Sequence, residues 1–285
     1  MIFLFRLLSH WPLRWLHRLG AAAGWLSWLC SPTYRRHLRE NMTIALGEAP
    51  ARHYRNAAIA SAGQTSFELP RIWLRTLEET AAAVVGVSGW ELVEAAAKAG
   101  KGIIFLSGHL GCFEISAQYL ATRMPLTVLY RAPRQGWLQA MIETGRARGD
   151  RLRIAAADLA GVRTLIKALK RGEAIALLPD QVPKNGEGCW LDFFGRPAYT
   201  MTLAARFSEL GAAVIMFRVE RLPGGAGYHF HLQPPMRPLA GTSEERAQQI
   251  NHEIEGLIRQ CPGQYLWGYN RYKRPRGVVA PPETH

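Results

Sequence analysis

The pattern of apolar and polar positions changes near residue 89. Beyond it, short apolar runs alternate with stretches in which apolar residues recur every three to four positions. Short runs bounded by glycine or charged residues are typical of buried strands, and the longer spacing is typical of amphipathic helices. The pattern predicts strands at 102–106, 126–130, 174–178, 212–219 and 228–232. It predicts helical structure at 33–80, 90–99, 113–123, 137–148, 162–171, 200–210 and 250–261.

Strands that alternate with helices indicate an α/β fold, with a largely parallel or mixed sheet flanked by helices. The last two predicted strands are separated by the turn Pro223-Gly224-Gly225, which favours a hairpin between them. We assign residues 31–276 to this α/β domain. Residues 277–285, which include Pro281 and Pro282, are expected to form a flexible tail.

Residues 1–30 have a different character, because six tryptophan and phenylalanine residues are interleaved there with arginine and leucine. The uninterrupted apolar part, Leu19 to Cys30, is 12 residues long, whereas a membrane-spanning helix needs about 20. Tryptophan combined with arginine is typical of a helix at the bilayer interface. The basic residues Arg35, Arg36 and Arg39 that follow favour the cytoplasmic side of an anionic membrane. We expect a membrane-associating helix; the alternative is a buried amphipathic helix of the globular domain.

The net charge of +13 predicts that the protein meets polyanions. The candidates are nucleic acid, an anionic membrane, and phosphorylated substrates with an acidic carrier protein. The sequence contains no helix-turn-helix, zinc-finger or RNA-binding aromatic signature, so we expect no nucleic-acid partner. Its four cysteines are far apart and no His-Glu-x-x-His motif occurs, so a zinc site is not indicated.

The strongest candidate for chemistry is the segment from Phe105 to Glu114, in which His109 stands between two glycines directly after an apolar run. An α/β protein places reactive groups at this point, where a buried strand ends and a turn leads into a helix. Histidine is a suitable general base, and a nearby carboxylate can fix its tautomer. His109 in the turn and Glu114 in the first helical turn can converge. An isolated pair with this spacing also has a plainer interpretation, as a surface histidine and an ordinary N-terminal helix charge.

The neighbouring strand ends support the first interpretation. Arg131 follows the strand at 126–130, with Arg146 further on, and Asp180 and Gln181 follow the strand at 174–178. In a parallel sheet these loops lie on one edge. Arginine there can bind phosphate or a developing oxyanion.

Taken together, these segments resemble the bacterial lipid A late acyltransferases, the lauroyl/myristoyl transferase family within the glycerolipid acyltransferase group. The matching motifs are His109-x-x-x-x-Glu114, Tyr130-Arg131 with Gly145-Arg146, Pro179-Asp180-Gln181 with Phe193-Phe194-Gly195 and Thr200, and Gln264-Tyr265-Leu266-Trp267 with Asn270-Arg271-Tyr272-Lys273. The similarity covers nearly the whole chain. Tyr269-Asn270-Arg271 stands where many members carry His-Arg-Arg.

The resemblance implies an acyltransferase that moves a fatty acyl chain from an acyl carrier protein thioester to a hydroxyl of a phosphorylated glucosamine lipid, a lipid A precursor. His109 would be the general base and Glu114 would hold it. The same resemblance implies that no metal or other cofactor is needed, and that the enzyme works at the cytoplasmic face of the inner membrane.

Binding roles follow from the same resemblance. The expected oxyanion-binding or substrate-binding residues are Arg131, Arg146, Asp180 and Gln181, and the expected acceptor-binding residues are Asn270, Arg271 and Lys273. We expect Arg271 to contact the acceptor head group where the chain emerges into solvent.

Three alternatives remain open from the sequence. Cys112 lies inside the motif and is an alternative nucleophile, although direct transfer needs none. The acceptor could be another lipid, such as a lysophospholipid or an aminolipid. A non-catalytic peripheral membrane protein is the alternative from another class.

Overall fold

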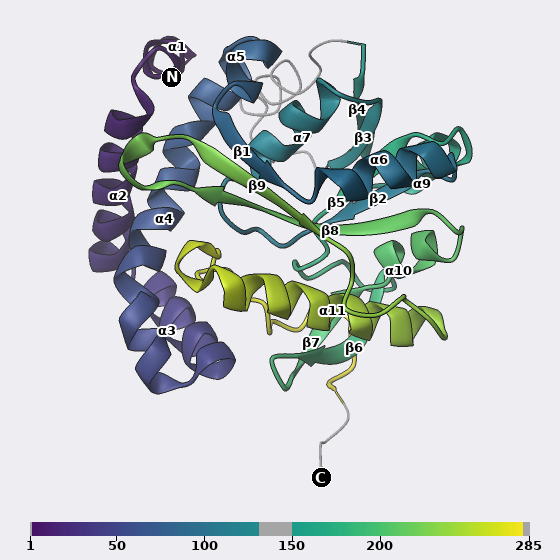
Figure 1. Cartoon of the computed structure of the whole chain (residues 1–285). Coiled ribbons are helices and arrows are strands. Elements are labelled where there is room, and N and C mark those ends of the chain that lie inside the picture. The colour runs from purple at the N-terminus through teal and green to yellow at the C-terminus, as the bar shows by residue number, and fades with distance from the viewer. Residues whose placement is uncertain (1, 131–149, 282–285) are drawn as a thin grey trace.

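The structure is a computed structural model that describes residues 2–130 and 150–281. Its centre is a seven-stranded sheet with the order β1-β9-β8-β2-β5-β3-β4 (Figure 1). The strands are β1 (Val84–Ser88), β2 (Ile103–Leu106), β3 (Leu126–Tyr130), β4 (Leu152–Ala156), β5 (Ala174–Leu177), β8 (Ala213–Arg221) and β9 (Tyr228–Gln233). Strands β8, β2, β5, β3 and β4 run parallel, and β9 pairs antiparallel with β8. The predicted mixed α/β sheet and the predicted hairpin are confirmed.

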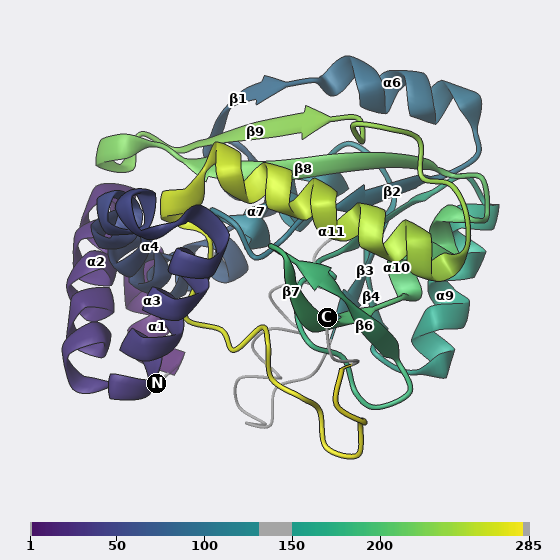
Figure 2. The same cartoon turned by 90° about the horizontal axis from the view of Figure 1, so that it is seen from below.

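Helices cover both faces of this sheet (Figure 2). One face packs against α6 (Trp90–Ala99) and α7 (Phe113–Ala121). The other packs against α9 (Leu159–Lys170), α10 (Leu203–Ser208) and α11 (Ser243–Gln260). Side chains alternate along a strand, so Ile103 and Phe105 enter the first core while Ile104 and Leu106 enter the second. Strand β2 is therefore buried on both sides, which explains its continuous apolar run.

The N-terminal quarter of the chain forms a helical layer beside one end of the sheet (Figure 1). It comprises α1 (Ile2–Ser9), α2 (Leu13–Cys30), α3 (Pro32–Leu46), α4 (Glu48–Leu74) and the short α5 (Leu77–Ala81). Helices α2 and α4 approach closely, because glycines face each other: a Cβ on Gly63 would lie 1.9 Å from the Gly20 carbonyl oxygen. Within the described residues, the helices are too short or too polar to cross a bilayer.

Helix α2 combines the two alternatives drawn from the sequence. One side packs against the domain and buries Leu16, His17 and Gly20. The other side leaves large apolar residues exposed, among them Trp15, Leu26 and Leu29. Residues 2–30 are thus a layer of the folded domain that also presents an apolar face outward.

One predicted helix begins in the wrong place. Thr200 belongs to strand β7 (Arg196–Met201), which pairs with β6 (Gly188–Phe193), and helix α10 begins only at Leu203. The turn between these strands uses positive φ at Phe194 and Gly195, which closes a tight hairpin. Strands β1 and β4 were not predicted, and the predicted helix at 137–148 lies outside the described residues.

Candidate active site

His109 lies in a short loop between β2 and α7 that is held on two sides. The backbone N–H of Cys112 donates to the carbonyl of Val219 on β8, and the N–H of Gly111 donates to the carbonyl of Gln264, both at 2.9 Å. Gly111 has φ +60°, and a Cβ there would lie 1.9 Å from the Val219 oxygen, so the loop needs glycine at this point. The position of His109 is therefore fixed by backbone contacts with two distant segments.

The ring of His109 is paired with Asp180, which follows the neighbouring strand β5. Its Nδ1 lies 2.7 Å from Asp180 Oδ1, and the backbone N–H of His109 donates to Oδ2 at 2.9 Å. On the far side of the ring, the Gln181 side-chain amide lies 3.1 Å from Nε2. We assign the neutral tautomer with its proton on Nδ1, because a carboxylate can only accept that hydrogen bond and the amide can donate to Nε2. Nε2 then carries the lone pair that a general base requires.

Asp180 is buried yet remains ionised. Burial acts to raise its pKa, but the charge and hydrogen bonds of His109 and a hydrogen bond from Tyr265 outweigh burial and lower the pKa below its usual value. The Tyr265 hydroxyl donates to Oδ2 at 3.1 Å. Burial raises the pKa of Tyr265 itself well above 10, which keeps this donor protonated. A second tyrosine, Tyr269, accepts the backbone N–H of Val182 at 2.9 Å and so supports the loop that carries Asp180.

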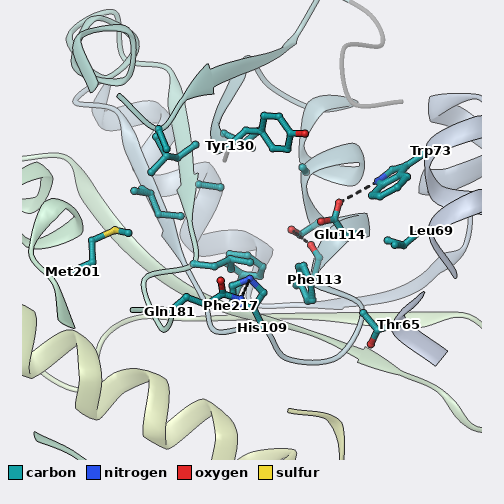
Figure 3. Close-up of a pocket in the computed structure, with 18 of the residues that line it drawn as sticks. Thr65, Leu69, Trp73, His109, Phe113, Glu114, Tyr130, Gln181, Met201 and Phe217 are labelled. Carbon is teal, nitrogen blue, oxygen red and sulfur yellow. Dashed lines mark hydrogen bonds between the residues drawn. The ribbon is translucent and has the colours of Figure 1, made fainter. Parts of the chain in front are cut away.

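His109 and Gln181 face a cavity of about 400 Å³ at the carboxyl ends of β2, β3 and β5 (Figure 3). Most of its lining is apolar, with Leu69, Trp73, Phe113, Ala117, Val128, Leu129, Ala176, Leu177, Leu178, Val182, Met201 and Phe217 beside the polar groups. An alkyl chain fits such walls, because burying apolar surface is favourable. The cavity therefore offers space for a hydrocarbon group next to a base.

Glu114 also lines this cavity, where it contacts a residue of the N-terminal helical layer. The Trp73 indole N–H on α4 donates to Glu114 Oε2 at 3.2 Å (Figure 3). Asp180, and not Glu114, lies at Nδ1 of His109, and the catalytic part expected of Glu114 stays a prediction. Asp180, expected to bind substrate, contacts the His109 ring and its backbone N–H in this structure.

The remaining candidates divide into three cases. Arg131 and Arg146 lie outside the described residues. Arg271 is only 2% exposed and donates to the Tyr199 carbonyl at 2.9 Å and to Thr200 Oγ1 at 2.7 Å. It therefore does not emerge into solvent as expected, and its guanidinium is committed to strand β7. Asn270 is half-buried, and Lys273 is exposed with its ammonium 5.0 Å from the Tyr269 ring centre.

Cys112 is 1% exposed, and burial raises the pKa of its thiol well above 9, with the charge of Glu68 adding to the shift. A protonated, buried thiol is a poor nucleophile. Within the described ranges, no cluster of three or more His, Cys, Asp or Glu side chains is arranged to hold a metal ion.

Tyr265 and Tyr269 are the supporting residues that the sequence reasoning missed. Both belong to the C-terminal segment whose motifs carry the family resemblance, which was the available signal. Trp73 lies in a segment predicted to be helical from its basic and apolar composition, and no sequence pattern indicates its contact with Glu114.

A histidine paired with a buried carboxylate, beside an apolar cavity at the ends of parallel strands, is an arrangement that suits acyl transfer on an α/β fold. Comparison with known proteins makes this class specific. A family model described as "Bacterial lipid A biosynthesis acyltransferase" matches residues 1–274. The chain belongs to this family and is an acyltransferase.

Individual proteins similar to this chain carry names that agree with the family model. The chain is 28% identical over 275 residues to the lipid A biosynthesis lauroyltransferase of Escherichia coli strain K12, which covers 92% of this chain and 87% of the relative. It is 28% identical over 197 residues to the lipid A biosynthesis palmitoleoyltransferase of the same strain, or 67% of this chain and 62% of that relative. A lipid A biosynthesis acyltransferase from Haemophilus influenzae is 29% identical over 184 residues, which covers 63% of this chain and 56% of that protein.

Proposed function

We propose that this enzyme transfers a fatty acyl chain from an acyl carrier protein thioester to a hydroxyl of a phosphorylated glucosamine lipid, a lipid A precursor. The observation that carries the proposal is the pairing of His109 Nδ1 with buried Asp180 while the ring lines an apolar cavity. Family membership supports the lipid A pathway.

In the proposed reaction, His109 Nε2 accepts the proton of the acceptor hydroxyl as its oxygen attacks the thioester carbonyl. The Gln181 amide, now 3.1 Å from Nε2, gives way to that hydroxyl. Asp180 stabilises the imidazolium that forms. Collapse of the tetrahedral intermediate releases the carrier thiolate, which takes the proton from Nε2, so that an ester and a thiol are the products.

Glu114 keeps a part in this proposal, as a second carboxylate in the same cavity. Its contact with Trp73 places it on the cavity wall, where it can accept a hydrogen bond from a hydroxyl of the acceptor. We propose that Glu114 positions the acceptor sugar and that Asp180 supports the base. Glu114→Gln should then raise the acceptor KM and lower kcat while leaving the donor KM unchanged.

The charge of the protein supports the two substrates. A net charge of +13 favours an acidic carrier and a phosphorylated acceptor. We propose Arg131 and Arg146 as contacts for the thioester oxyanion or the acceptor phosphates. Asn270 and Lys273 remain proposed acceptor contacts, whereas Arg271 is assigned to packing because it is buried.

Location at the cytoplasmic face of the inner membrane belongs to the same proposal. Helices α1 and α2 expose Phe3, Leu7, Trp15, Leu26 and Leu29, and apolar residues with arginine beside them suit an interfacial helix. Both proposed substrates would then be available from one side of the membrane.

Purified enzyme should be offered acyl carrier thioester or acyl coenzyme A with a lipid A precursor, a lysophospholipid or an aminolipid, and the products identified by mass spectrometry. We expect an acylated lipid A precursor, formed faster with the carrier-bound donor. Faster acylation of the lysophospholipid or aminolipid would replace the proposed acceptor. Equal use of acyl coenzyme A would contradict the carrier requirement.

A further inference from the structure

A second cavity of about 400 Å³ lies apart from the active site, between α2, α4 and the turns η1 (Pro223–Gly225) and η2 (Pro262–Gln264). It shares no lining residue with the cavity that contains His109. The wall between them includes Arg221, which lines the second cavity and donates to Thr65, a residue that lines the first. The proposed acyl transfer has no use for this second space.

The second cavity is cationic. Arg14 and Arg18 line it from α2, and its described lining residues include no aspartate or glutamate. His17 and Arg221 also line it, but both contact the buried carboxylate of Glu68, at 2.7 and 2.6 Å. Glu68 therefore balances the charge of Arg221 and pairs with His17, and Arg14 and Arg18 supply the remaining positive charge of the cavity.

The two arginines are neighbours on one helical face, because they are four residues apart. Like charges at this spacing destabilise a helix, and a bound anion between them removes the repulsion. Small side chains leave the space beside them open, since Ala21, Ala57 and Ala60 line the same cavity. The cavity thus combines a positive rim with room for a compact anionic group.

The position of the arginines on α2 indicates where the anion comes from. Each arginine is followed by an exposed apolar residue, Trp15 or Leu19, about 100° further around the helix. The Arg18 guanidinium carbon lies 4.8 Å from the Trp15 ring centre. When the apolar side of α2 enters a bilayer, Arg14 and Arg18 lie at the level of the lipid head groups, next to the cavity.

We propose that this second cavity is a docking site for the phosphate-bearing head group of an anionic membrane phospholipid, held by Arg14 and Arg18. The site anchors α2 at a defined depth and rotation on the membrane. The inference rests on the membrane location in the proposed function, and it adds a specific lipid site distinct from the acceptor site.

Vesicle flotation tests the site, with vesicles of phosphatidylcholine alone or containing a minor fraction of phosphatidylglycerol. The variant Arg14→Gln/Arg18→Gln should lose about tenfold or more of its affinity for the anionic vesicles. Its matched control is Arg163→Gln/Arg237→Gln, which removes two exposed charges elsewhere on the surface and should lose much less. The variant Ala60→Leu fills the cavity without changing charge, and it should also lose the preference for anionic vesicles.

Four results would overturn the site. Equal losses in both double variants, with no effect of Ala60→Leu, would mean diffuse attraction. Unchanged affinity of Arg14→Gln/Arg18→Gln for anionic vesicles would also refute the proposed lipid site. If inorganic phosphate, added without vesicles, raises the melting temperature of wild type but not of Arg14→Gln/Arg18→Gln, the cavity is a site for a free anion and not for a lipid. A raised donor KM in that variant, with vesicle binding unchanged, would assign the arginines to the carrier protein.

Acyl transfer on detergent-dispersed acceptor separates this inference from the proposed function. All of these variants should turn over at the wild-type rate there, because none of the substituted residues lines the active-site cavity. A wild-type enzyme that is inactive with the proposed substrates would refute the proposed function while leaving the vesicle result interpretable.

Discussion

Two of the histidine–carboxylate pairs among the described residues have the same length but lie in very different surroundings. His109 Nδ1 lies 2.7 Å from Asp180, and His17 Nε2 lies 2.7 Å from Glu68. The His109 side chain is 18% exposed and lines the active-site cavity, whereas the His17 side chain is 7% exposed. Glu68 is also bound by the guanidinium of Arg221 through both carboxylate oxygens, at 2.6 and 2.8 Å.

The partners of each carboxylate explain the difference. Burial acts to raise the pKa of Glu68, but Arg221 and then His17 outweigh it and lower the pKa to about 2. Glu68 therefore forms a permanent ion pair that joins α2 and α4 to the end of β8. Asp180 is paired with His109 and accepts further hydrogen bonds from neutral groups, so its charge remains available to stabilise His109 when the ring becomes protonated. A short histidine–carboxylate pair is thus not a catalytic signature by itself. Both rings line a cavity, but Arg221 neutralises Glu68, and only His109 lines the apolar cavity at the ends of β2, β3 and β5.

Substituting each histidine in turn should give the largest difference in turnover between the two histidine–carboxylate pairs. His109→Ala should lower turnover about 10²- to 10⁴-fold, the usual cost of losing a general base, with the fold intact. His17→Ala should keep turnover within about threefold on detergent-dispersed acceptor, because His17 has no place in the reaction. Steady-state kinetics with circular dichroism as the folding control measure both. Near wild-type turnover in folded His109→Ala would refute the mechanism.

Substituting the carboxylates sharpens the comparison. Asp180→Asn keeps the shape of the side chain but cannot stabilise an imidazolium, so kcat should fall by at least about 10²-fold. The melting temperature should fall only modestly, since the amide still accepts one hydrogen bond. Kinetics and thermal unfolding on the same preparation measure this contrast. A large loss of stability with turnover near wild type would make Asp180 a purely structural residue.

Glu68→Gln should show the opposite behaviour. Removing one partner of a buried ion pair leaves Arg221 uncompensated and should cost about 3 to 5 kcal/mol of unfolding free energy. The pKa of Glu68 is lowered from 4.5 to about 2 in the folded state. Its contribution is therefore fully present above pH 4.5 and is lost as the pH falls toward 2. In denaturant unfolding, the difference in unfolding free energy between wild type and Glu68→Gln should become smaller below pH 4.5. A difference that grows as the pH falls would contradict this assignment.

Cys112 lies between the two regions and should give the smallest effect. Its backbone belongs to the His109 loop, but its buried thiol lies in the electrostatic surroundings of Glu68, Arg221 and Tyr228. Cys112→Ala should keep turnover within about threefold, because direct transfer uses no thiol. An inactive but folded variant, or a trapped acyl-cysteine seen by mass spectrometry, would require a covalent intermediate.

The sequence predicted which loops at the strand ends form the site better than it predicted which side chains contact one another. The apolar run at β2 and the glycines around His109 predicted the loop at the strand end, and Asp180 was placed after β5. However, β2 and β5 are separated in sequence by β3 and β4, so no local pattern revealed that they are neighbours in the sheet. Local spacing points to Glu114, five residues from His109, as the partner of the ring, whereas Asp180 is 71 residues away.

The predictions for Arg271 and Thr200 were wrong for the same reason, because both residues make contacts that are distant in sequence. Arg271 follows an apolar segment and has basic neighbours, which suggests solvent, yet its guanidinium reaches back to the carbonyl of Tyr199. Thr200 precedes residues of good helix propensity, yet it pairs with Cys189 across a hairpin. Tertiary contacts overrode local preference at both positions.

A double-mutant cycle on His109 and Asp180 tests the central claim most directly. If Asp180 acts only through His109, Asp180→Asn should slow the wild-type enzyme at least about 10²-fold but should slow His109→Ala by no more than about threefold. The measurement is kcat/KM for acyl transfer in all four proteins at one pH. Losses that multiply across the cycle would show that Asp180 acts independently of His109, and would contradict the assignment of this pair as the working base of the enzyme.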